Sequence, residues 1–359
     1  MRLRSLVVSC LGVFVAIARP SVGFAQHTGR LVADTLHPKA LEDNKYGDSP
    51  NRAVLVYLPP SYDSVATRRY PTLYLLHGFG SNERVWVRGY RGFSVQTSAD
   101  SLIAAGAMHE MIIVMPNGSN RLGGSFYTNS EATGNWDDFI AQELVAYIDG
   151  KYRTIARADA RGLAGHSMGG YGAFALAERH GGDVYSAVYA LSGCCTRFAH
   201  TITPGMAPVW QTLSRLTSPM DARGLQFLPQ VFLAMSAAFS PNVNKPPFYV
   251  DFPFEEKDGR WKTNEDVERR WIEHSPEEMV RTYRDHLTRL RAFAFDVGDR
   301  DELVASGTLD SMDATLNRAG IAHTYETYPG THTSEIGARM ITKVLPFFSR
   351  TLAAPTGVQ

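Results

Sequence analysis

Short apolar runs alternate along the chain with segments in which apolar residues recur at helical spacing. Residues 72–78 and 111–118 are nearly continuous apolar runs that end in glycine, and residues 52–60 are strand-like and end at prolines. Such runs are typical of strands that are buried on both faces of a sheet. Four later runs have the same character: residues 162–165, 185–193, 291–298 and 322–330.

Two segments show the spacing of amphipathic helices. In residues 136–149 one face collects the apolar positions Trp136, Phe139, Ile140, Leu144, Tyr147 and Ile148. Asn135 is placed to cap this helix, and Asp137 and Asp138 suit the positive end of its dipole. Pro346 should kink or shorten a last helix, whose apolar stripe is Ile336, Met340, Ile341, Val344, Leu345 and Phe348.

The alternation of strands and helices predicts an α/β fold with a mostly parallel central sheet flanked by helices. We expect one such domain over residues 26–359. Residues 196–274 break the rhythm, because they carry prolines, aromatics and charged helical patches but no clear sheet strand. A structureless loop of this length is uncommon in a compact domain. The segment is therefore predicted to be a helical, cap-like insertion after the sixth core strand, placed to form a wall of a pocket.

The N-terminus has the anatomy of a secretory signal peptide. Arg2 and Arg4 precede an uncharged, mostly apolar run, and Gly23 and Ala25 offer small residues for cleavage after Ala25. The apolar run is too short to span a bilayer comfortably. We expect residues 1–25 to be removed and the protein to be secreted or periplasmic, with no stable membrane insertion after cleavage.

Charge and cysteine content narrow the classes of function. The 359 residues include 36 Lys and Arg and 36 Asp and Glu, and no charged tail is present, which argues against nucleic acid as a partner. Cys194 and Cys195 can close only a strained ring and are expected to be small buried residues. No Cys/His cluster has metal-ligand spacing and no dinucleotide-type glycine pattern occurs, so we expect neither a metal nor another cofactor.

The clearest chemical signature is GHSMG at residues 165–169. An apolar run precedes it and a helical segment that stops at Gly181 follows, so this G-x-S-x-G pattern lies in the strand–turn–helix context of a nucleophile elbow. Side chains at the two glycines would clash as the turn raises the serine into a strained, exposed position. Ser167 is therefore the candidate nucleophile; the alternative is a tight turn with no chemical role.

A serine needs a base and an orienting carboxylate to act as a nucleophile. Hydrolases of the α/β type place them after the serine, with the acid before the histidine. His332 lies in a loop after the last predicted strand and is the favoured base. His77 and His166 flank glycine turns and are expected to shape them. Surface or core roles are expected for His274, His286 and His323. The candidate acids lie at the end of the strand at 291–298 or directly after it and are Asp296, Asp299, Asp301 and Glu302.

The three aspartates differ in their position relative to the turn after this strand. Asp296 lies within the strand pattern, so the pleat fixes its direction, and it is expected to point away from the site or to pair with a helix. Asp299 follows Gly298 directly and suits the turn itself. Asp301 comes after the turn, from where its side chain can reach back toward the loop that carries His332. Asp301 is the predicted acid.

An oxyanion hole requires two backbone N–H groups aimed at one point. Met168, directly after the candidate nucleophile, supplies one of them. The sequence LLHGFGSN at residues 75–82 supplies the other, since Gly78 and Gly80 let the chain turn closely after its strand. We assign this second donor to Phe79; a simple strand-ending turn is the alternative.

Together these motifs resemble the esterase family of α/β-hydrolases that includes S-formylglutathione hydrolases, feruloyl esterases, enterochelin esterases and mycolyltransferases. The matching stretches are VYLPPSYD, YPTLYLLHGFG, SFYTNS, WDDFIAQELVAYIDGKYRT, GHSMGGYGAFALA and TYPGTHTS. They cover most of residues 52–193 and 291–350, whereas residues 196–274 match no pattern of the family. The resemblance implies an α/β-hydrolase fold and the following roles: Ser167 as nucleophile, His332 as base, Asp301 as acid, and Phe79 and Met168 as oxyanion amides.

The expected function is that of a secreted serine carboxylesterase that works through an acyl-enzyme. An acyltransferase that passes the acyl group to a sugar or lipid hydroxyl uses the same triad, and a binding module without activity would lack one of its members. Aromatic residues near the predicted mouth suggest a small-molecule or polysaccharide-linked aryl ester. Candidate contacts are Tyr127, Trp136 and Tyr171, for which a place in the core is the alternative, together with Phe79 and, in the insertion, Trp261 and Trp271.

Overall fold

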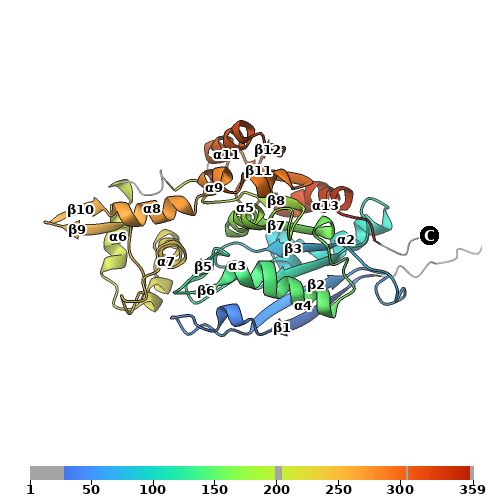
Figure 1. Cartoon of the computed structure of the whole chain (residues 1–359), viewed down its shortest axis with the longest axis horizontal. Helices are drawn as coiled ribbons and strands as arrows, with labels where there is room; N and C mark the ends of the chain where they lie inside the picture. The colour runs from blue at the N-terminus through green and yellow to red at the C-terminus, as the bar shows by residue number, and fades with distance from the viewer. Residues whose placement is uncertain (1–27, 199–203, 305, 356–359) are drawn as a thin grey trace, which may run out of the picture.

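The computed structural model describes residues 28–198, 204–304 and 306–355 (Figure 1). The predicted signal peptide, residues 1–25, lies outside the described residues. Nowhere in the described ranges does a helix combine the length and the apolar character that a membrane crossing needs.

An eight-stranded sheet runs through the middle of the molecule. Its strands are, in spatial order, β1 (Arg30–Leu36), β2 (Arg52–Leu58), β4 (Ile112–Pro116), β3 (Thr72–Leu76), β7 (Arg161–His166), β8 (Ala187–Leu191), β11 (Ala292–Gly298) and β12 (Thr324–Tyr328). The pairs β1–β2 and β2–β4 are antiparallel, and every pair from β4 to β12 is parallel. The mostly parallel α/β architecture predicted from the sequence is confirmed.

Each of the seven predicted strands is present, but β1 was missed. Its sequence RLVADTL mixes polar and apolar residues, and most of its positions are exposed or half-buried. β1 lies at an edge and pairs only with β2, so it needs no continuous apolar run. With β1 included, β8 is the sixth strand of the sheet along the chain.

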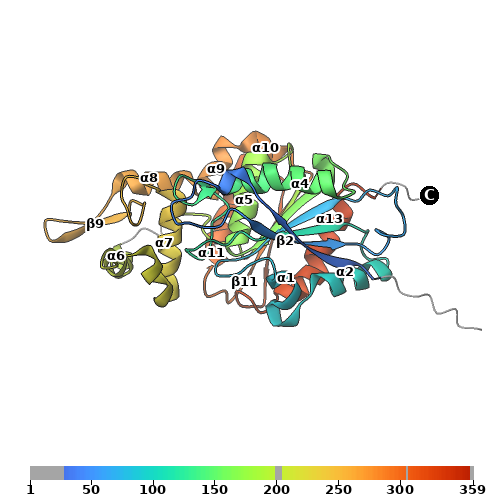
Figure 2. The same cartoon turned by 90° about the horizontal axis from the view of Figure 1, so that it is seen from below.

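Helices cover both faces of the sheet, because side chains on each buried strand alternate between two apolar clusters. In β2, Val54 and Val56 join one cluster, whereas Leu55 and Tyr57 join the other. The first cluster is covered by α5 (Met168–His180), α9 (Pro276–Thr282), α10 (Arg284–Thr288), α11 (Ser306–Ala319) and the helix formed by α3 (Trp136–Asp138) and α4 (Leu144–Lys151). The second is covered by α1 (Val85–Arg88), α2 (Val95–Ala104), α12 (Ile336–Arg339) and α13 (Leu345–Thr351) (Figure 2).

The two predicted helices contain features that periodicity did not reveal. α3 and α4 are joined by a π-helical turn at Phe139–Glu143, and α12 and α13 by another at Met340–Val344, just before Pro346. Asn135 does not cap α3 with its side chain. Instead Oδ1 of Asn129 accepts hydrogen bonds from the N–H groups of Asp137 (2.9 Å) and Asp138 (3.2 Å). Ile341, predicted on the apolar stripe, is 38% exposed, because the wider turn rotates it away from the core.

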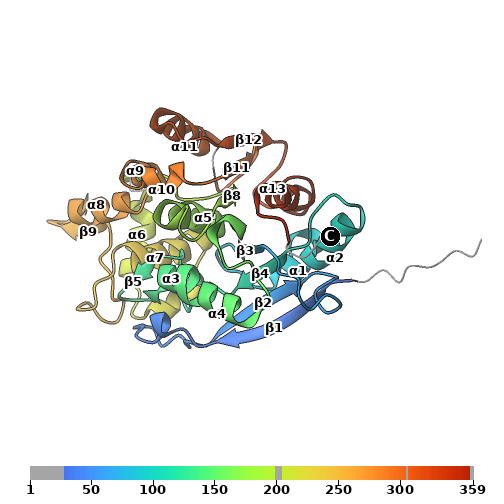
Figure 3. The ribbon, with the colours of Figure 1, turned by 45° about the vertical axis from the view of Figure 1, so that its right-hand side comes forward.

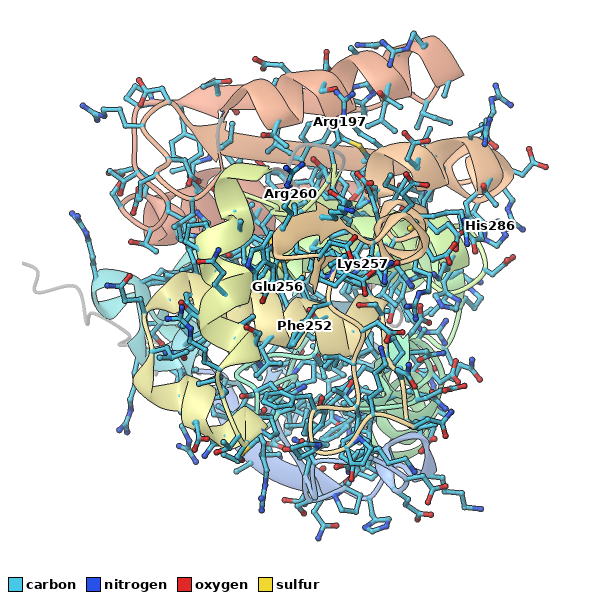
Figure 4. All side chains as sticks on the ribbon, turned by 90° about the vertical axis from the view of Figure 1, so that its left-hand side faces the viewer. Arg197, Phe252, Glu256, Lys257, Arg260 and His286 are labelled. Carbon is cyan, nitrogen blue, oxygen red and sulfur yellow. The ribbon has the colours of Figure 1, made fainter. Side chains whose placement is uncertain are left out.

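The predicted insertion forms a lobe at one end of the molecule (Figures 1 and 3). It contains α6 (Ala207–Ser214), α7 (Phe227–Phe239), α8 (Glu265–Glu273) and a hairpin of β9 (Phe254–Lys257) and β10 (Arg260–Thr263). The hairpin was not predicted. It is separate from the central sheet, and Figure 4 views it end-on, with Glu256, Lys257 and Arg260 labelled. The lobe has an aromatic core in which Trp210 and Trp271 lie edge to face, with ring centroids 6.0 Å apart.

Candidate active site

Ser167 occupies a sharp turn between β7 and α5. Its backbone has φ 58° and ψ −117°, a conformation that costs a non-glycine residue energy and that persists only where the surroundings enforce it. The Ser167 N–H donates to the carbonyl of Leu191 at 3.0 Å, and the Ser167 carbonyl accepts from the N–H of Tyr171 at 2.9 Å. β8 and the first turn of α5 therefore fix the strained residue from two sides.

The glycines on both sides of the turn are required by close backbone contacts. A Cβ on Gly165 would lie 2.2 Å from the carbonyl oxygen of Gly169, and a Cβ on Gly169 would lie 2.2 Å from that of Leu76. Any side chain at either position would push β3, β7 and α5 apart. The predicted reason for the glycines thus agrees with the structure, with backbone atoms as the obstacle.

His332 and Asp301 meet in the loops that follow β12 and β11. Nδ1 of His332 lies 3.0 Å and 2.9 Å from the two carboxylate oxygens of Asp301. The side chains of both residues are almost wholly buried, at 5% and 0% exposure. Because Nδ1 faces the carboxylate, the opposite ring nitrogen, Nε2, is directed away from it. The structure therefore brings together the histidine and the carboxylate that the sequence paired.

Hydrogen bonds keep the Asp301 carboxyl ionised. Burial alone would raise its pKa, but the hydrogen bond with His332 and those from the backbone N–H groups of Val304 and Leu303 more than offset this, so the pKa is lowered. Asp301 Oδ1 accepts these two backbone hydrogen bonds at 2.8 Å and 2.9 Å. The carboxylate is thus both charged and fixed in direction.

The other acid candidates have different partners. Asp296 is fully buried and accepts hydrogen bonds from Arg339, at 2.6 Å and 2.9 Å, and from the Tyr189 hydroxyl at 2.7 Å. Burial raises its pKa to about 6, against the opposing effect of Arg339. Asp299 accepts the N–H of Gly330 at 2.9 Å. Asp296 therefore pairs with a helix, as predicted, and Asp299 ties the loop of Asp301 to the loop after β12.

Glu302 also touches the histidine loop, through the backbone. It accepts the N–H of His332 at 3.2 Å. It does not contact the imidazole ring, so Asp301 is the carboxylate that can orient the ring.

His166 packs against the ring of His332 and binds its backbone carbonyl, a role that sequence reasoning did not assign. Its ring lies 4.7 Å from the ring of His332, Nε2 donates to the His332 carbonyl at 2.8 Å, and Nδ1 lies 2.9 Å from the Tyr90 hydroxyl. Burial, reinforced by the nearby His332, lowers the His166 pKa to about 3. His166 is therefore a neutral brace directly before Ser167 in the chain. The signal was its place inside the G-x-S-x-G pattern.

The predicted oxyanion donors, Phe79 and Met168, both belong to backbone next to Ser167. A Cβ built on Gly78 would be 3.3 Å from Cβ of Ser167, so the backbone before Phe79 passes directly beside the serine. Met168 is the first residue of α5, where an N–H has no partner within the helix. In the described residues, neither the Phe79 nor the Met168 N–H is used in a backbone hydrogen bond.

His77 fixes this loop from behind. Its Nδ1 donates to the carbonyl of Gly78 at 2.8 Å, and its Nε2 accepts the N–H of Gly118 at 2.8 Å. Burial lowers its pKa to about 4, so a neutral ring holds the two loops together. The shaping role expected for His77 agrees with these contacts.

A cavity of about 560 Å³ opens beside Ser167. Its walls come from the loops after β3, β4, β8 and β11, from the start of α11, and from one face of α7 in the insertion. The lining residues are Phe79, Phe126, Ser167, Met168, Cys194, Cys195, Arg197, Phe227, Leu228, Val231, Phe232, Met235, Leu303, Val304, Gly307, Thr308 and Ser311. Sequence reasoning missed the α7 residues, although their nearly unbroken apolar character was a signal of a buried helix.

Tyr127, Trp136 and Tyr171 do not reach this cavity. All three are fully buried, and their polar atoms donate to backbone carbonyls: Tyr127 to His77 at 2.9 Å, Trp136 to Thr133 at 2.9 Å and Tyr171 to His274 at 3.0 Å. The expectation that they contact substrate is therefore replaced by the alternative of a place in the core. Of the predicted aromatic contacts, Phe79 lines the cavity.

Cys194 and Cys195 form part of the cavity wall as free thiols. Their sulfur atoms are 2.9 Å apart, and the Cys194 N–H donates to the Ser167 carbonyl at 3.3 Å. Both are half-buried, so they are less enclosed than predicted. As for metals, the described ranges contain no group of three or more His, Cys, Asp or Glu side chains arranged to hold an ion.

Comparison with known proteins identifies the family of the chain. A family model described as "Putative esterase" matches residues 49–336, which include all of the candidate site residues named above. The chain belongs to this family. It is 37% identical over 141 residues to an esterase of Mycobacterium tuberculosis, which covers 38% of this chain and 28% of that protein. It is 38% identical over 127 residues to an endo-1,4-beta-xylanase/feruloyl esterase of Xylanibacter ruminicola, which covers 32% of this chain and 16% of that protein.

Solved structures resemble the chain over nearly its whole length. A ferulic acid esterase matches with a TM-score of 0.61 and 25% identity, covering 91% of this chain and 100% of that chain. An S-formylglutathione hydrolase from Staphylococcus aureus matches with a TM-score of 0.57 and 18% identity, covering 89% and 99%. This member of the esterase family thus has the α/β-hydrolase fold that the sequence motifs implied.

Proposed function

We propose that this esterase-family chain is a secreted serine carboxylesterase that cleaves its substrate through an acyl-enzyme. Ser167 is the nucleophile, His332 the general base, and Asp301 the carboxylate that orients the base. The observation that carries the proposal is the buried Asp301–His332 pair. The His332 ring lies 4.7 Å from the ring of His166, the residue directly before Ser167. A carboxylate that orients an imidazole near a strained, cavity-lining serine is the arrangement that activates a serine nucleophile.

The chemistry follows from these contacts. With Nδ1 held by Asp301, Nε2 of His332 accepts the Ser167 proton as Oγ attacks the ester carbonyl. The N–H groups of Phe79 and Met168 stabilise the negative charge on the carbonyl oxygen. His332 then returns the proton to the departing alcohol, and a water molecule, activated by the same nitrogen, releases the acid from Ser167.

The proposal includes export and an ester substrate that is a small molecule or is linked to a polysaccharide. Export is supported by the arginines and apolar run at the N-terminus. The substrate class is supported by the ferulic acid esterase among the structural neighbours and by the feruloyl esterase among the sequence relatives. N-terminal sequencing of protein from the culture medium or periplasm should begin at Gln26; an intact Met1 there would contradict export by cleavage.

The activity is tested with purified mature protein and a panel of p-nitrophenyl and cinnamoyl esters. The native protein should hydrolyse several of them, and Ser167→Ala should lose this activity while its circular dichroism spectrum is unchanged. The matched control is Ser64→Ala, an exposed serine that hydrogen bonds only locally, to Ser61, and it should retain full activity. Full activity in Ser167→Ala would contradict the proposal. Added glycerol or trehalose would reveal transfer as an acylated acceptor.

A further inference from the structure

Exposed apolar side chains gather at the mouth of the Ser167 cavity. Four large apolar side chains are exposed in the described part of the chain: Phe227 (47%), Leu228 (47%), Leu303 (50%) and Ile341 (38%). The first three line the cavity, and only Ile341 lies elsewhere. Exposed apolar groups that cluster around a cavity mark a surface that binds something apolar.

The strand order divides the cavity into two sides. β7, which ends just before Ser167, lies between β3 and β8. Phe79 and Phe126 follow β3 and β4 on one side, whereas Asp301 and His332 follow β11 and β12 on the other. Because His332 must protonate the departing alcohol, the alcohol lies toward β11 and β12. The acyl group is then directed toward β3 and β4.

The acyl side is walled by aromatic and aliphatic side chains. The Phe79 ring lies 6.3 Å from Phe126 and 5.9 Å from Phe227, which places the N-terminus of α7 against the loop after β3. Val231 and Met235 continue the same face of α7 into the cavity at helical spacing. The wall thus runs without a charged group from the enclosed part of the cavity to the exposed rim at Phe227 and Leu228.

The opposite wall carries the polar groups of the cavity, beside the apolar Leu303 and Val304. Arg197, after β8, lies beneath α11 in the view of Figure 4, with Nη1 3.4 Å from the Ser311 hydroxyl and Nε 3.7 Å from the Glu277 carboxylate. Thr308 lines the same wall. Arg197 is the one charged side chain among the described residues that line the cavity. The two walls therefore suit the two ends of an ester with an apolar acyl group and a polar alcohol.

We infer that the substrate is an ester of an extended apolar acyl chain, which lies along α7 and leaves the cavity over Phe227 and Leu228. This rests on the proposed function, and it names the acyl class that the same site selects. Each methylene that leaves water on binding is worth about a four-fold factor. The preference should therefore rise with chain length until the chain extends past the rim.

The test is a series of p-nitrophenyl acetate, butyrate, octanoate and dodecanoate, each below its aggregation concentration. For the native protein, kcat/KM for octanoate should exceed that for acetate by about ten-fold or more. The double variant Phe227→Ser/Leu228→Ser should reduce this ratio by about ten-fold. Val231→Trp, which fills the α7 side of the cavity, should reduce it as well. The matched control Ile341→Ser removes the fourth exposed apolar side chain, away from the cavity, and should leave the ratio unchanged.

The outcomes separate this inference from the proposed function. Activity that falls from acetate to octanoate, or a ratio that is the same in the native protein and both α7 variants, overturns the acyl assignment while the esterase proposal stands. If no ester in the series is cleaved and Ser167 does not react with a fluorophosphonate, the proposed function itself fails. If kcat/KM does not rise with acyl length but rises with alcohol length in a series of alkyl acetates, the two sides are reversed and the inference is also overturned.

Discussion

The central sheet and the insertion lobe meet at the Ser167 cavity but are built in different ways. At the sheet, reactive groups are held by backbone contacts, as at Gly165 and Gly169, where no Cβ can be accommodated. In the lobe, α7 contributes to the cavity through side chains that rest on an aromatic core around Trp210 and Trp271. Backbone contacts allow few substitutions, whereas apolar side chains exchange at modest cost. We therefore expect the sheet to determine the chemistry and the lobe to determine the choice of substrate.

The largest effect is expected at the acid of the sheet region. Asp301→Asn should preserve the fold but favour the wrong tautomer of His332, and turnover should drop about 10⁴-fold, as in serine proteases. Asp299→Asn is the control: its carboxylate binds the Gly330 N–H, so it should lower stability more than turnover. Steady-state kinetics and thermal unfolding of both variants check this. A fully active Asp301→Asn would remove Asp301 from the site.

Substituting a scaffold glycine should cost stability. A Cβ on Gly169 meets the Leu76 carbonyl at 2.2 Å, so Gly169→Ala should lose about 4 kcal/mol or more, or fail to fold. The control is Gly150→Ala in α4, where nothing lies within 4 Å of the new Cβ; it should gain about 0.5–1 kcal/mol from helix propensity. Denaturant unfolding measures both. Equal stabilities would contradict the view of the elbow as a backbone-limited structure.

A substitution in the core of the lobe is expected to lower stability more than it lowers the reactivity of Ser167. Trp210 is fully buried against Phe232 and Trp271, so Trp210→Ala should cost about 3–5 kcal/mol. Trp210→Phe keeps most of the packing and should cost less. Below the unfolding temperature, both variants should still acylate Ser167, because its turn does not depend on Trp210. Loss of acylation in a folded variant would mean that the lobe holds the reactive groups in place.

A smaller effect is expected from pH. Burial lowers the pKa of His77 to about 4, of His166 to about 3 and of His274 to about 4. Because protons bind these rings more tightly in the unfolded chain, their stabilising contribution is complete above pH 6.5 and is lost as pH falls toward 4. Asp296, with a pKa raised to about 6, acts in the opposite direction between pH 4 and 6.

The net result should be a melting temperature that falls from pH 7 to pH 4.5. Each histidine contributes at most about 1.4 kcal/mol per pH unit. His77→Gln, directly after β3, and His274→Gln, at the end of α8, should therefore each make the decline shallower. The exposed His109→Gln should leave it unchanged. A stability that is independent of pH in the native protein would contradict the buried, neutral state of these rings.

The sequence predicted the sheet much better than the lobe, for a physical reason. A strand buried on both faces, such as residues 72–78, must be apolar throughout and ends at glycine or proline, so its pattern is local. The edge strand β1 and the hairpin β9–β10 lack that constraint, since much of their surface meets solvent. The Asn129 cap and the π-helical turns depend on tertiary contacts that periodicity does not encode.

The candidate site shows the same division. Ser167, Asp301 and His332 follow strands whose ends can be located from the sequence pattern. The structure brings Asp301 and His332 into contact. The sequence does not decide whether Tyr127, Trp136 and Tyr171 lie in the core or line the cavity, because an aromatic residue on a helix or loop is compatible with either position. The α7 wall belongs to residues 196–274, in which no sequence motif was found, so only the structure places it beside Ser167.

The central claim is that the sheet holds Ser167 as a nucleophile, and covalent labelling tests it most directly. The folded protein is incubated with a fluorophosphonate, digested, and mapped by mass spectrometry, with Ser167→Ala and Asp301→Asn treated in parallel. The account predicts one stoichiometric adduct on Ser167 in the native protein, strongly slowed labelling in Asp301→Asn, and none in Ser167→Ala. An adduct on another serine, or no adduct on folded native protein, would contradict it.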